Sequence, residues 1–266
     1  MRRLKSPLPK NSALHKFAVQ AAFYAAVILL WQGLSSSGFL PGRLIPSPHN
    51  ILGTLHRLSG QGSFWAAIRS SLYRIAVGYS ISVTVGLFLG FFLTRVKFLE
   101  NTLSSLFLGM QAFPSICWVP LALLWFGVND AAVIFVVVFG SMFAISVATN
   151  QAIRNVPPLY LKAARTMGAK GWHLYAGVIF PAAIPQIIYG LKLGWSYAWR
   201  TLIGSEIIVA GFGLGRLFNE GQKANDVAQI FAVNVIVMVV SLLVDFGIFG
   251  KIEKEVRHRW GLEVAR

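Results

Sequence analysis

Long apolar stretches separated by short polar segments dominate the chain. Each of the six stretches is close to the roughly 20 residues that an α-helix needs to cross a bilayer. They cover residues 17–34, 72–93, 106–126, 132–150, 182–207 and 228–249. The pattern predicts an all-α integral membrane protein, a polytopic bundle of about six transmembrane helices. Residues 17–249 would form the transmembrane domain, between a tail at 1–16 and a basic tail at 250–266.

Prolines interrupt the third apolar stretch at Pro114 and Pro120. A proline within a span leaves backbone carbonyls without partners, and neighbouring helices must satisfy them. We therefore expect a packed bundle rather than isolated helices. Between the first two spans, the prolines of Leu44–Pro48 predict an extended piece, and Asn50–Leu58 is amphipathic.

The segment 157–176, between the fourth and fifth spans, is too polar for a bilayer and predicts a helix–turn–helix. Its first helix begins at Pro157 and Pro158, which suit a first turn that needs no amide donor. It ends at Gly168, the residue type that most readily adopts the left-handed conformation after a helix. A second short helix is expected from about Lys170.

One face of this first helix is apolar, because Leu159, Ala163 and Met167 recur at helical spacing. Ala164 and Gly168 are four residues apart, which permits close packing by another surface. We interpret the segment as a docking element for a partner. A loop helix without a partner is the alternative.

Composition supports a membrane protein and argues against a soluble one. The 266 residues are 56% hydrophobic and 12% charged, with a mean hydropathy of +0.64, whereas a soluble domain carries about 25% charged residues. The net charge of +15 could indicate a nucleic-acid partner, but Lys and Arg form no runs with interleaved aromatics. We expect no nucleic-acid partner and attribute the basic residues to flanks in contact with lipid headgroups on the cytoplasmic side. The basic start runs into the first apolar stretch without an A-x-A site, so it is interpreted as an anchor.

The Lys and Arg distribution predicts the orientation. With the N-terminus inside, and with Arg69 and Arg74 counted at the outer end of the second span, the outer segments hold Arg43, Arg57, Arg216 and Lys223, while the inner segments hold four times as many. Both termini and the segment 157–176 are therefore expected in the cytoplasm.

No pattern in the sequence indicates catalysis. The five histidines are not at metal-ligand spacing, and no G-x-x-x-x-G-K-[ST] motif occurs. Gly211–Gly215 is glycine-rich but follows a span, so we interpret it as a turn. We expect no enzyme activity, no metal and no cofactor bound by this chain, so that transport would need a separate ATPase or an ion gradient.

The fifth span is the most polar. Lys192, Ser196 and Arg200 lie four residues apart and share a helix face, with Trp195, Trp199 and Glu206 on an adjacent one. Because charges within a span usually face a cavity or a partner, one interpretation is a cationic stripe along a path for an anion. In the alternative, Lys192 or Arg200 pairs with Glu206 or Asp245 or reaches the membrane interface. In the second span, Arg69 and Arg74 are interpreted as interface anchors.

The segment 157–181 resembles the cytoplasmic signature of ATP-binding-cassette (ABC) import permeases, which reads E-A-A, three residues, G, nine residues, I, one residue, L-P. Lys162-Ala163-Ala164, Gly168, Val178 and Phe180-Pro181 have this spacing, with Lys162 where the family has Glu. Further motifs resemble the nitrate, sulfonate and taurine import subfamily: Leu44-Ile45-Pro46-Ser47-Pro48, Ser71-Leu72-Tyr73-Arg74 with Gly78, Pro120 with Leu124-Trp125-Phe126-Gly127, Ala163–Ala169, Glu206 and Gly213-Leu214-Gly215.

This resemblance implies a type I ABC importer permease fold in the bacterial inner membrane. It implies a homodimer, two ATPase subunits that hold ATP-Mg, and a periplasmic or lipid-anchored binding protein. The ATPases would be coupled through Lys162, Ala163, Ala164, Gly168 and Ala169. The resemblance also implies alternating access for a small solute, which in this subfamily is commonly an anion.

The substrate path is expected to include Lys192, Ser196, Trp199, Arg200 and Glu206. A secondary transporter or channel working without an ATPase is the alternative, although the spans offer it only Glu206 and Asp245 as acidic groups. A membrane scaffold is a third possibility, and it would need neither the signature spacing nor a polar fifth span.

Overall fold

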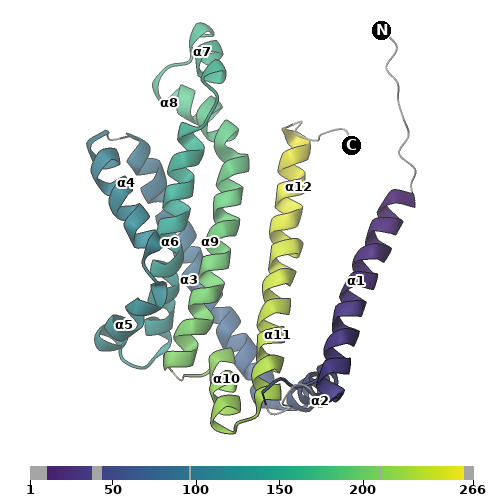
Figure 1. Cartoon of the computed structure of the whole chain (residues 1–266). Coiled ribbons are helices and arrows are strands. Elements are labelled where there is room, and N and C mark those ends of the chain that lie inside the picture. The colour runs from purple at the N-terminus through teal and green to yellow at the C-terminus, as the bar shows by residue number, and fades with distance from the viewer. Residues whose placement is uncertain (1–10, 38–43, 96, 210, 261–266) are drawn as a thin grey trace.

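A computed structural model of the chain describes residues 11–37, 44–95, 97–209 and 211–260, and within these ranges every regular element is a helix. The longest elements are α1 (Asn11–Ser36), α3 (Gly62–Arg95), α6 (Asp130–Arg154), α9 (Phe180–Val209) and α11 (Val227–Val244). They run side by side along one axis (Figure 1). Five stretches of the described residues are long and apolar enough to span a membrane, and a bent pair of helices gives a sixth if it is counted as one span.

The third span, which the sequence predicts to be interrupted by prolines, is a bent pair of helices. α4 (Lys97–Ala112) is followed by a 3₁₀ turn, η1 (Ser115–Trp118), and by α5 (Val119–Phe126). The two halves meet at 95°. Pro114 lies at the bend and has no amide hydrogen to continue the α4 ladder. The predicted interruption at Pro114 is confirmed, and its consequence is a sharp turn of the chain direction.

Shorter helices cap the two ends of the bundle. α2 (Pro48–Ser59), α5 and α10 (Leu214–Lys223) lie at one end, which we call the α10 end (Figure 1). α7 (Pro158–Thr166), α8 (Gly171–Leu174) and the tip of α12 (Gly250–Arg259) lie at the other, the α7 end. Two five-residue π-helical segments, η2 (Tyr175–Ile179) and η3 (Asp245–Phe249), join α8 to α9 and α11 to α12.

Side-chain caps begin several helices where the sequence changes from polar to apolar. The Ser47 hydroxyl accepts from the amide of Asn50 at 3.2 Å and starts α2. Asn129 caps α6 through the Ala132 amide, and Asp226 caps α11 through the Gln229 amide. Each cap supplies an acceptor to an amide that has no partner in the first helical turn.

α6 is the centre of the bundle and packs on α3, α4, α5 and α9. Over half (56%) of its most apolar stretch is buried, against none for α1. Glycines let the backbones approach closely, as is common between membrane helices. Gly90 of α3 lies so near α6 that an added Cβ would be 2.6 Å from the Ser146 carbonyl oxygen. Gly140 of α6 is equally close to Thr201 of α9.

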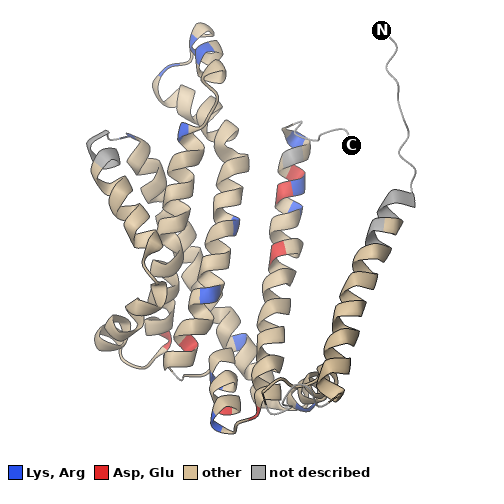
Figure 2. Ribbon diagram, viewed as in Figure 1, with Lys and Arg blue, Asp and Glu red and all other residues tan. Residues whose placement is uncertain are grey.

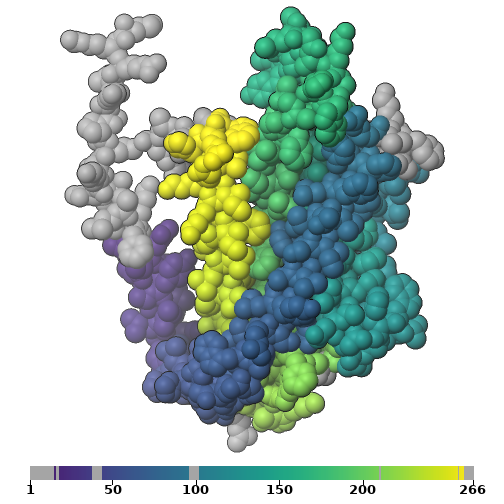
Figure 3. All heavy atoms as spheres, turned by 180° about the vertical axis from the view of Figure 1, so that it is seen from behind, coloured from purple at the N-terminus to yellow at the C-terminus, as the bar shows by residue number. Residues whose placement is uncertain are grey.

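α1 stands apart from the rest of the bundle. It is apolar around its whole circumference and its described side chains are exposed or half-buried. Figure 3 shows it as a separate purple rod above α2, beside the yellow α11–α12 segment. It meets the bundle near its last turns, where the Trp31 ring lies 6.2 Å from the Phe231 ring of α11. Lipid is the natural solvent for such a helix.

Candidate functional site

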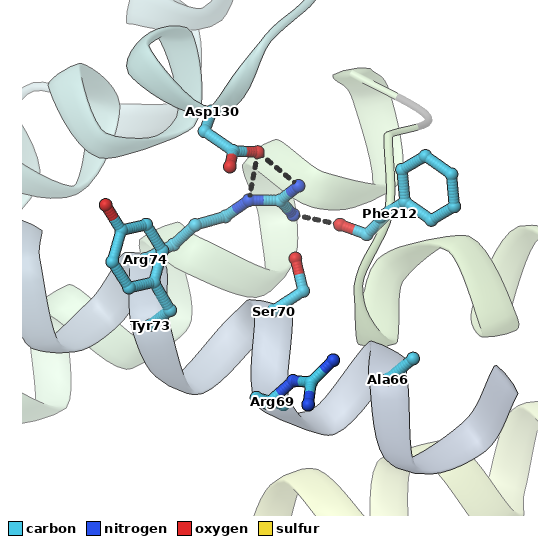
Figure 4. Close-up of a pocket in the computed structure, with 7 residues that line it drawn as sticks. All are labelled: Ala66, Arg69, Ser70, Tyr73, Arg74, Asp130 and Phe212. Atoms are coloured by element: carbon cyan, nitrogen blue, oxygen red, sulfur yellow. Dashed lines mark hydrogen bonds and ion pairs between the residues drawn. The ribbon is translucent and has the colours of Figure 1, made fainter. Parts of the chain in front are cut away.

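A buried network of charged groups holds the α10 end together. Arg74 of α3 is 3% exposed and Glu206 of α9 is 1% exposed, and their side chains form an ion pair at 2.8 Å. Arg74 also donates to Asp130 at the start of α6, at 2.6 and 2.9 Å, and to the Phe212 carbonyl oxygen (Figure 4). The Ser71 hydroxyl is 2.7 Å from the Glu206 carboxylate. The interpretation of Arg74 as an interface anchor is wrong, because its partners bury it.

The glycine-rich turn after α9 is shaped around this carboxylate. The amide of Gly215 donates to Glu206 at 3.1 Å, and the amide of Leu214 donates to the Ser71 hydroxyl at 2.9 Å. Gly213 has φ +143°, and a Cβ there would be within 2.6 Å of the Glu206 carboxylate. The turn expected at Gly211–Gly215 is confirmed, and it ties α10 to α3 and α9. Glu206 thus lies in a closed network, whereas the sequence placed it on the substrate path.

A hollow of about 440 Å³ borders the exposed side of this network (Figure 4). Arg69, Ser70 and Tyr73 of α3 line it beside Arg74 and Asp130. Arg69 is exposed, and no described residue forms an ion pair or hydrogen bond with it. The interpretation of Arg69 as an interface residue agrees with this exposure.

Lys192 pairs with a carboxylate in the middle of the bundle. Its Nζ lies 3.2 Å from Oδ2 of Asp245, which opens the π-helical segment η3. The two side chains are 33% and 24% exposed. This is the paired alternative set out for Lys192, and it connects α9 to the α11–α12 side of the bundle.

Arg200 has a different environment, at the edge of a second hollow of about 430 Å³. Its side chain is exposed, its Nε donates to the Ser196 carbonyl oxygen at 3.1 Å, and its guanidinium lies 4.7 Å from the centre of the Tyr197 ring. No carboxylate among the described residues forms an ion pair with it. Arg200 can therefore offer its guanidinium to a ligand, while Lys192 is already paired.

This second hollow lies between the bend of the α4–α5 pair and the helices α6 and α9. Its polar lining besides Arg200 is formed by Gln111, Ser115, Tyr197 and Thr201. Its apolar lining includes Met110, Phe113, Ile116 and Phe139. The hydroxyls of Ser115 and Thr201 are 2.8 Å apart and bond to each other.

The remaining predicted path residues are separated by the structure. Trp199 is buried between helices, and its indole N–H donates to the Val237 carbonyl oxygen of α11 at 3.0 Å. Trp195 is also buried and stacks on Trp199 with ring centres 5.8 Å apart. Ser196 is exposed on the α9 surface. The two indoles therefore belong to the core, and the predicted stripe does not face one cavity.

The predicted helix–turn–helix is present at the α7 end. Gly168, two residues after the end of α7, has φ +86°, and the amides of Gly168 and Ala169 donate to the carbonyls of Arg165 and Ala164. These two backbone hydrogen bonds, with a glycine in the left-handed region, form a Schellman motif. The predicted turn at Gly168 is thus confirmed.

The predicted coupling residues divide between two faces of this segment. Ala164 is buried and Ala169 half-buried, and both pack on a cluster with Leu174, Ile179 and other apolar residues of the same chain. Lys162, Ala163 and Gly168 are exposed. Leu159, Tyr160, Met167 and Trp172 extend the exposed surface with fractions of 71, 52, 88 and 63%. The close packing expected at Ala164 is thus made within the chain, and the free apolar face is the one with Leu159, Ala163 and Met167.

Sequence reasoning missed the residues that come from distant parts of the chain. Ser71 and Asp130 complete the Glu206 network across separations of 135 and 56 residues, and Gln111, just before the bend at Pro114, lines the same hollow as Arg200. One available signal was the rule that a charge in a span has a partner. By this rule, Glu206 in the fifth span predicts a cation in another span, and Arg74 is that cation.

The comparison with protein families is consistent with this architecture. A family described as "Binding-protein-dependent transport system inner membrane component" matches residues 82–258. SsuC of Escherichia coli, named as an aliphatic sulfonates transport permease, is 31% identical over 82% of this chain and 81% of its own length. The nitrate import permease NrtB of Synechocystis is 28% identical over 92% of this chain and 90% of its own length. The bicarbonate transport system permease CmpB of the same organism is 28% identical over 83% of this chain and 82% of its own length.

Solved structures share the fold. The inward-facing MetNI methionine ABC transporter aligns with a TM-score of 0.63 at 20% identity, over 73% of this chain and 96% of the solved chain. An amino acid ABC transporter solved with histidines aligns with a TM-score of 0.64 at 20% identity, over 76% of this chain and 97% of the solved chain. The predicted fold class, an all-α type I ABC importer permease, is confirmed.

Proposed function

The chain belongs to the family of binding-protein-dependent transport system inner membrane components and is thus a permease subunit of an ATP-driven importer; we propose that it forms the path of a small anion by alternating access. The observation that carries the anion assignment is Arg200. It is a cation at the edge of a hollow of about 430 Å³, nine residues before the end of α9. Because an arginine guanidinium makes bidentate bonds to planar and tetrahedral oxyanions, it suits a sulfonate, nitrate or carboxylate.

The substrates in the names of relatives support the same class. Aliphatic sulfonates, nitrate and bicarbonate differ in shape, but all are small anions at neutral pH. A single guanidinium beside a hollow can serve such different anions. A site that must also release its ligand should be weak, so most of the selectivity would reside in the binding protein.

We propose that the exposed face of α7 and α8 couples this chain to an ATPase that binds ATP-Mg. Its apolar centre, Leu159, Ala163 and Met167, is exposed at the tip of the α7 end. Lys162 occupies the position at which related permeases have Glu, so its contact with the ATPase would differ in charge. A chain of this family that hydrolyses no ATP itself needs such a surface.

The proposed orientation places the α7 end in the cytoplasm and the α10 end outside. The first described turn of α1, the tip of α12 and the α7–α8 segment lie at the same end (Figure 1). Lys and Arg gather toward that end, and few charges lie in the middle of the helices (Figure 2). The excess of basic residues on cytoplasmic segments gives this direction. A periplasmic or lipid-anchored binding protein would then dock at the α10 end.

The test is transport by the assembled complex in proteoliposomes. The chain is purified with its cognate ATPase and binding protein, and uptake of a radiolabelled anion is measured with ATP, without ATP and with an ion gradient alone. Arg200→Gln should lower ATP-dependent uptake by at least about tenfold, the factor for a hydrogen bond to a charged group. Basal ATP hydrolysis and the amount of protein in the membrane should be unchanged.

Two outcomes would contradict the proposal. Uptake that proceeds on an ion gradient without ATP would identify a secondary transporter, and normal uptake by a well-expressed Arg200→Gln variant would remove Arg200 from the path. Arg69→Gln is the matched control, because Arg69 is an exposed cation on the other hollow. Loss of uptake in both variants would indicate an effect of net charge rather than of the path.

A further inference from the structure

Three cations lie on the exposed surface of α7, α8 and the turn between them. Lys162, Arg165 and Lys170 are exposed, and no described residue forms an ion pair with any of their side chains. His173, which is also exposed, adds no negative charge. Lys162 and Arg165 are three residues apart and are therefore neighbours on the surface of α7. Like charges at this spacing repel each other, so the pair does not stabilise the helix.

No carboxylate of the described chain neutralises these cations. No Asp or Glu occurs between Asp130 and Glu206, and both of these belong to the network at the α10 end. At the tip of α12, Glu255 pairs with Arg259 at 2.6 Å, and Glu253 is not free either. The α7–α8 surface therefore keeps its positive charge, and a negative partner has to come from another molecule.

An apolar centre accompanies the cations. Leu159, Met167 and Trp172 are 71, 88 and 63% exposed. α7 lies beyond the ends of α4 and α12 along the axis of the bundle, which places these side chains away from the apolar spans (Figure 1). The bias of basic residues toward the cytoplasm explains the sign of the charge, but it does not explain apolar side chains at the tip. Met and aromatic side chains surrounded by charged ones are typical of a surface that binds another protein.

The backbone of this surface is held in place from within. Ala164 and Leu174 are buried in one apolar cluster beneath it. The Ala169 amide donates to the Ala164 carbonyl oxygen at 2.9 Å, and Gly168 and Gly171 have the positive φ angles that the turn between α7 and α8 requires. A partner therefore meets a preformed surface, and little backbone ordering opposes its association.

We propose that this surface fits an acidic groove of the ATPase, in which carboxylates surround an apolar floor and pair with Lys162, Arg165 and Lys170. A Glu in place of Lys162 could pair with Arg165 beside it, whereas Lys162 leaves both cations to the partner. The charge selects the ATPase, because a basic groove would be repelled and an acidic groove attracted. This inference rests on the proposed function and deepens it, since it assigns the chemistry of the partner's surface.

The first test is zero-length cross-linking of the permease–ATPase complex in lipid nanodiscs. A carbodiimide joins a lysine amine to a carboxylate only where the two groups are in contact. Mass spectrometry of the digested complex should show Lys162 joined to an Asp or Glu of the ATPase. Lys162→Arg is the matched control: it keeps the charge but has no amine to couple, so the cross-link should disappear while the affinity for the ATPase stays within about twofold of wild type.

The second test measures the affinity of the ATPase for the permease by surface plasmon resonance. Lys162→Glu should weaken binding about 3- to 20-fold, because it replaces an attraction at the interface with a repulsion. The difference should shrink between about 0.05 M and about 0.5 M salt, since salt screens exposed charges. Lys223→Glu makes the same change on an exposed residue of α10, at the other end, and should leave the affinity unchanged. Replacing the cross-linked carboxylate of the ATPase with Lys should restore binding to the Lys162→Glu variant.

Three results would overturn the inference and leave the proposed function standing. They are an ATP-driven complex in which Lys162 cross-links to no carboxylate of the ATPase, a Lys162→Glu variant that binds the ATPase as tightly as wild type, and an effect of Lys162→Glu that appears only in nanodiscs with anionic lipid. The last result would assign the cations to the membrane surface. An ATPase that neither co-purifies with the chain nor drives uptake would count against the proposed function, and the inference would fall with it.

Discussion

Charged side chains within the spans differ in what surrounds them. Glu206 and Arg74 are nearly inaccessible and satisfy each other together with Ser71 and two backbone groups. Lys192 and Asp245 form a half-buried pair. Among the described residues, Arg200 contacts only the Ser196 carbonyl oxygen and the Tyr197 ring in this way. The paired charges stabilise the fold, whereas Arg200 is the cation that we propose for contact with the substrate.

Glu206→Ala tests the structural role of the buried network. The change leaves Arg74 with Asp130 as its one remaining carboxylate and removes the acceptor of the Gly215 amide. Removing one partner of a buried ion pair costs about 3–5 kcal/mol. We expect the variant to be largely lost from the membrane fraction and to unfold at a lower temperature in detergent.

Glu220→Ala is the matched control for this measurement. Glu220 pairs with Arg216 four residues earlier on α10, and both side chains are nearly half exposed. An exposed pair of this kind contributes about 0–1 kcal/mol, so abundance and unfolding temperature should be close to wild type. Equal abundance of the two variants would show that the network does not hold the α10 end.

At the scale of elements, apolar length predicted the helices, and long-range contacts determined how they bend. The predicted spans 132–150, 182–207 and 228–249 lie within α6, α9 and the continuous α11–α12 segment. The 95° break could not be read from the sequence, because Pro114 and Pro120 predict an interruption but not its angle. No pattern in the sequence predicted the two π-helical segments, η2 and η3.

A second prediction concerns the contact between α3 and α6. A Cβ on Gly90 would be 2.6 Å from the Ser146 carbonyl oxygen, a backbone atom that cannot rotate away. Gly90→Ala must therefore separate the two helices, and overpacking of this kind costs about 1–3 kcal/mol. The unfolding temperature in detergent should fall.

Gly109→Ala supplies the comparison, because nothing lies within 4 Å of a Cβ on Gly109 of α4. The free energy of unfolding of the Gly109→Ala variant should therefore stay within about 0.5 kcal/mol of that of the wild type. A Gly90→Ala variant as stable as Gly109→Ala would mean that α3 and α6 pack less closely than described.

A third prediction separates the two faces of α7. Ala163→Asp adds a charge to the exposed face, so the protein should remain in the membrane while ATP-dependent uptake and ATPase co-purification fall. Ala164→Asp places the same carboxylate in a buried cluster, where an unpaired charge is costly, and the protein itself should be lost. Immunoblots of the membrane fraction beside uptake measure both effects. Normal coupling by Ala163→Asp would show that the ATPase contacts another surface.

At the scale of the whole molecule, one chain offers one α7–α8 surface, whereas ABC ATPases act in pairs. We therefore expect two copies of this chain in each complex, related by a two-fold axis, the commonest symmetry of protein oligomers. Native mass spectrometry of the detergent-solubilised complex should give two permease and two ATPase chains. One copy of this chain beside a different permease would contradict the prediction.

Local patterns of length, charge and glycine predict the membrane class, the polar helix–turn–helix formed by α7 and α8, and the turn at Gly168. The candidate site does not. Arg200 stands out in the sequence as a charge in a span, but its hollow depends on Gln111 and Ser115, which the bend brings to α9 from about 90 residues earlier in the chain. Glu206 stands out for the same reason, and only the structure shows that Arg74 neutralises it.

The isolation of α1 bears on how the protein is made. α1 leaves the ribosome before α3, α6 and α9, and no residue of its most apolar stretch is fully buried against the rest of the described chain. A helix that needs only lipid can enter the bilayer and remain there while later segments are still being synthesised. α3, with its buried Arg74 and Gly90, has no such independence, because its partners on α6 and α9 appear later in synthesis. We therefore expect α1 to partition into lipid early, and α3 to reach its final place only after α9 has been synthesised.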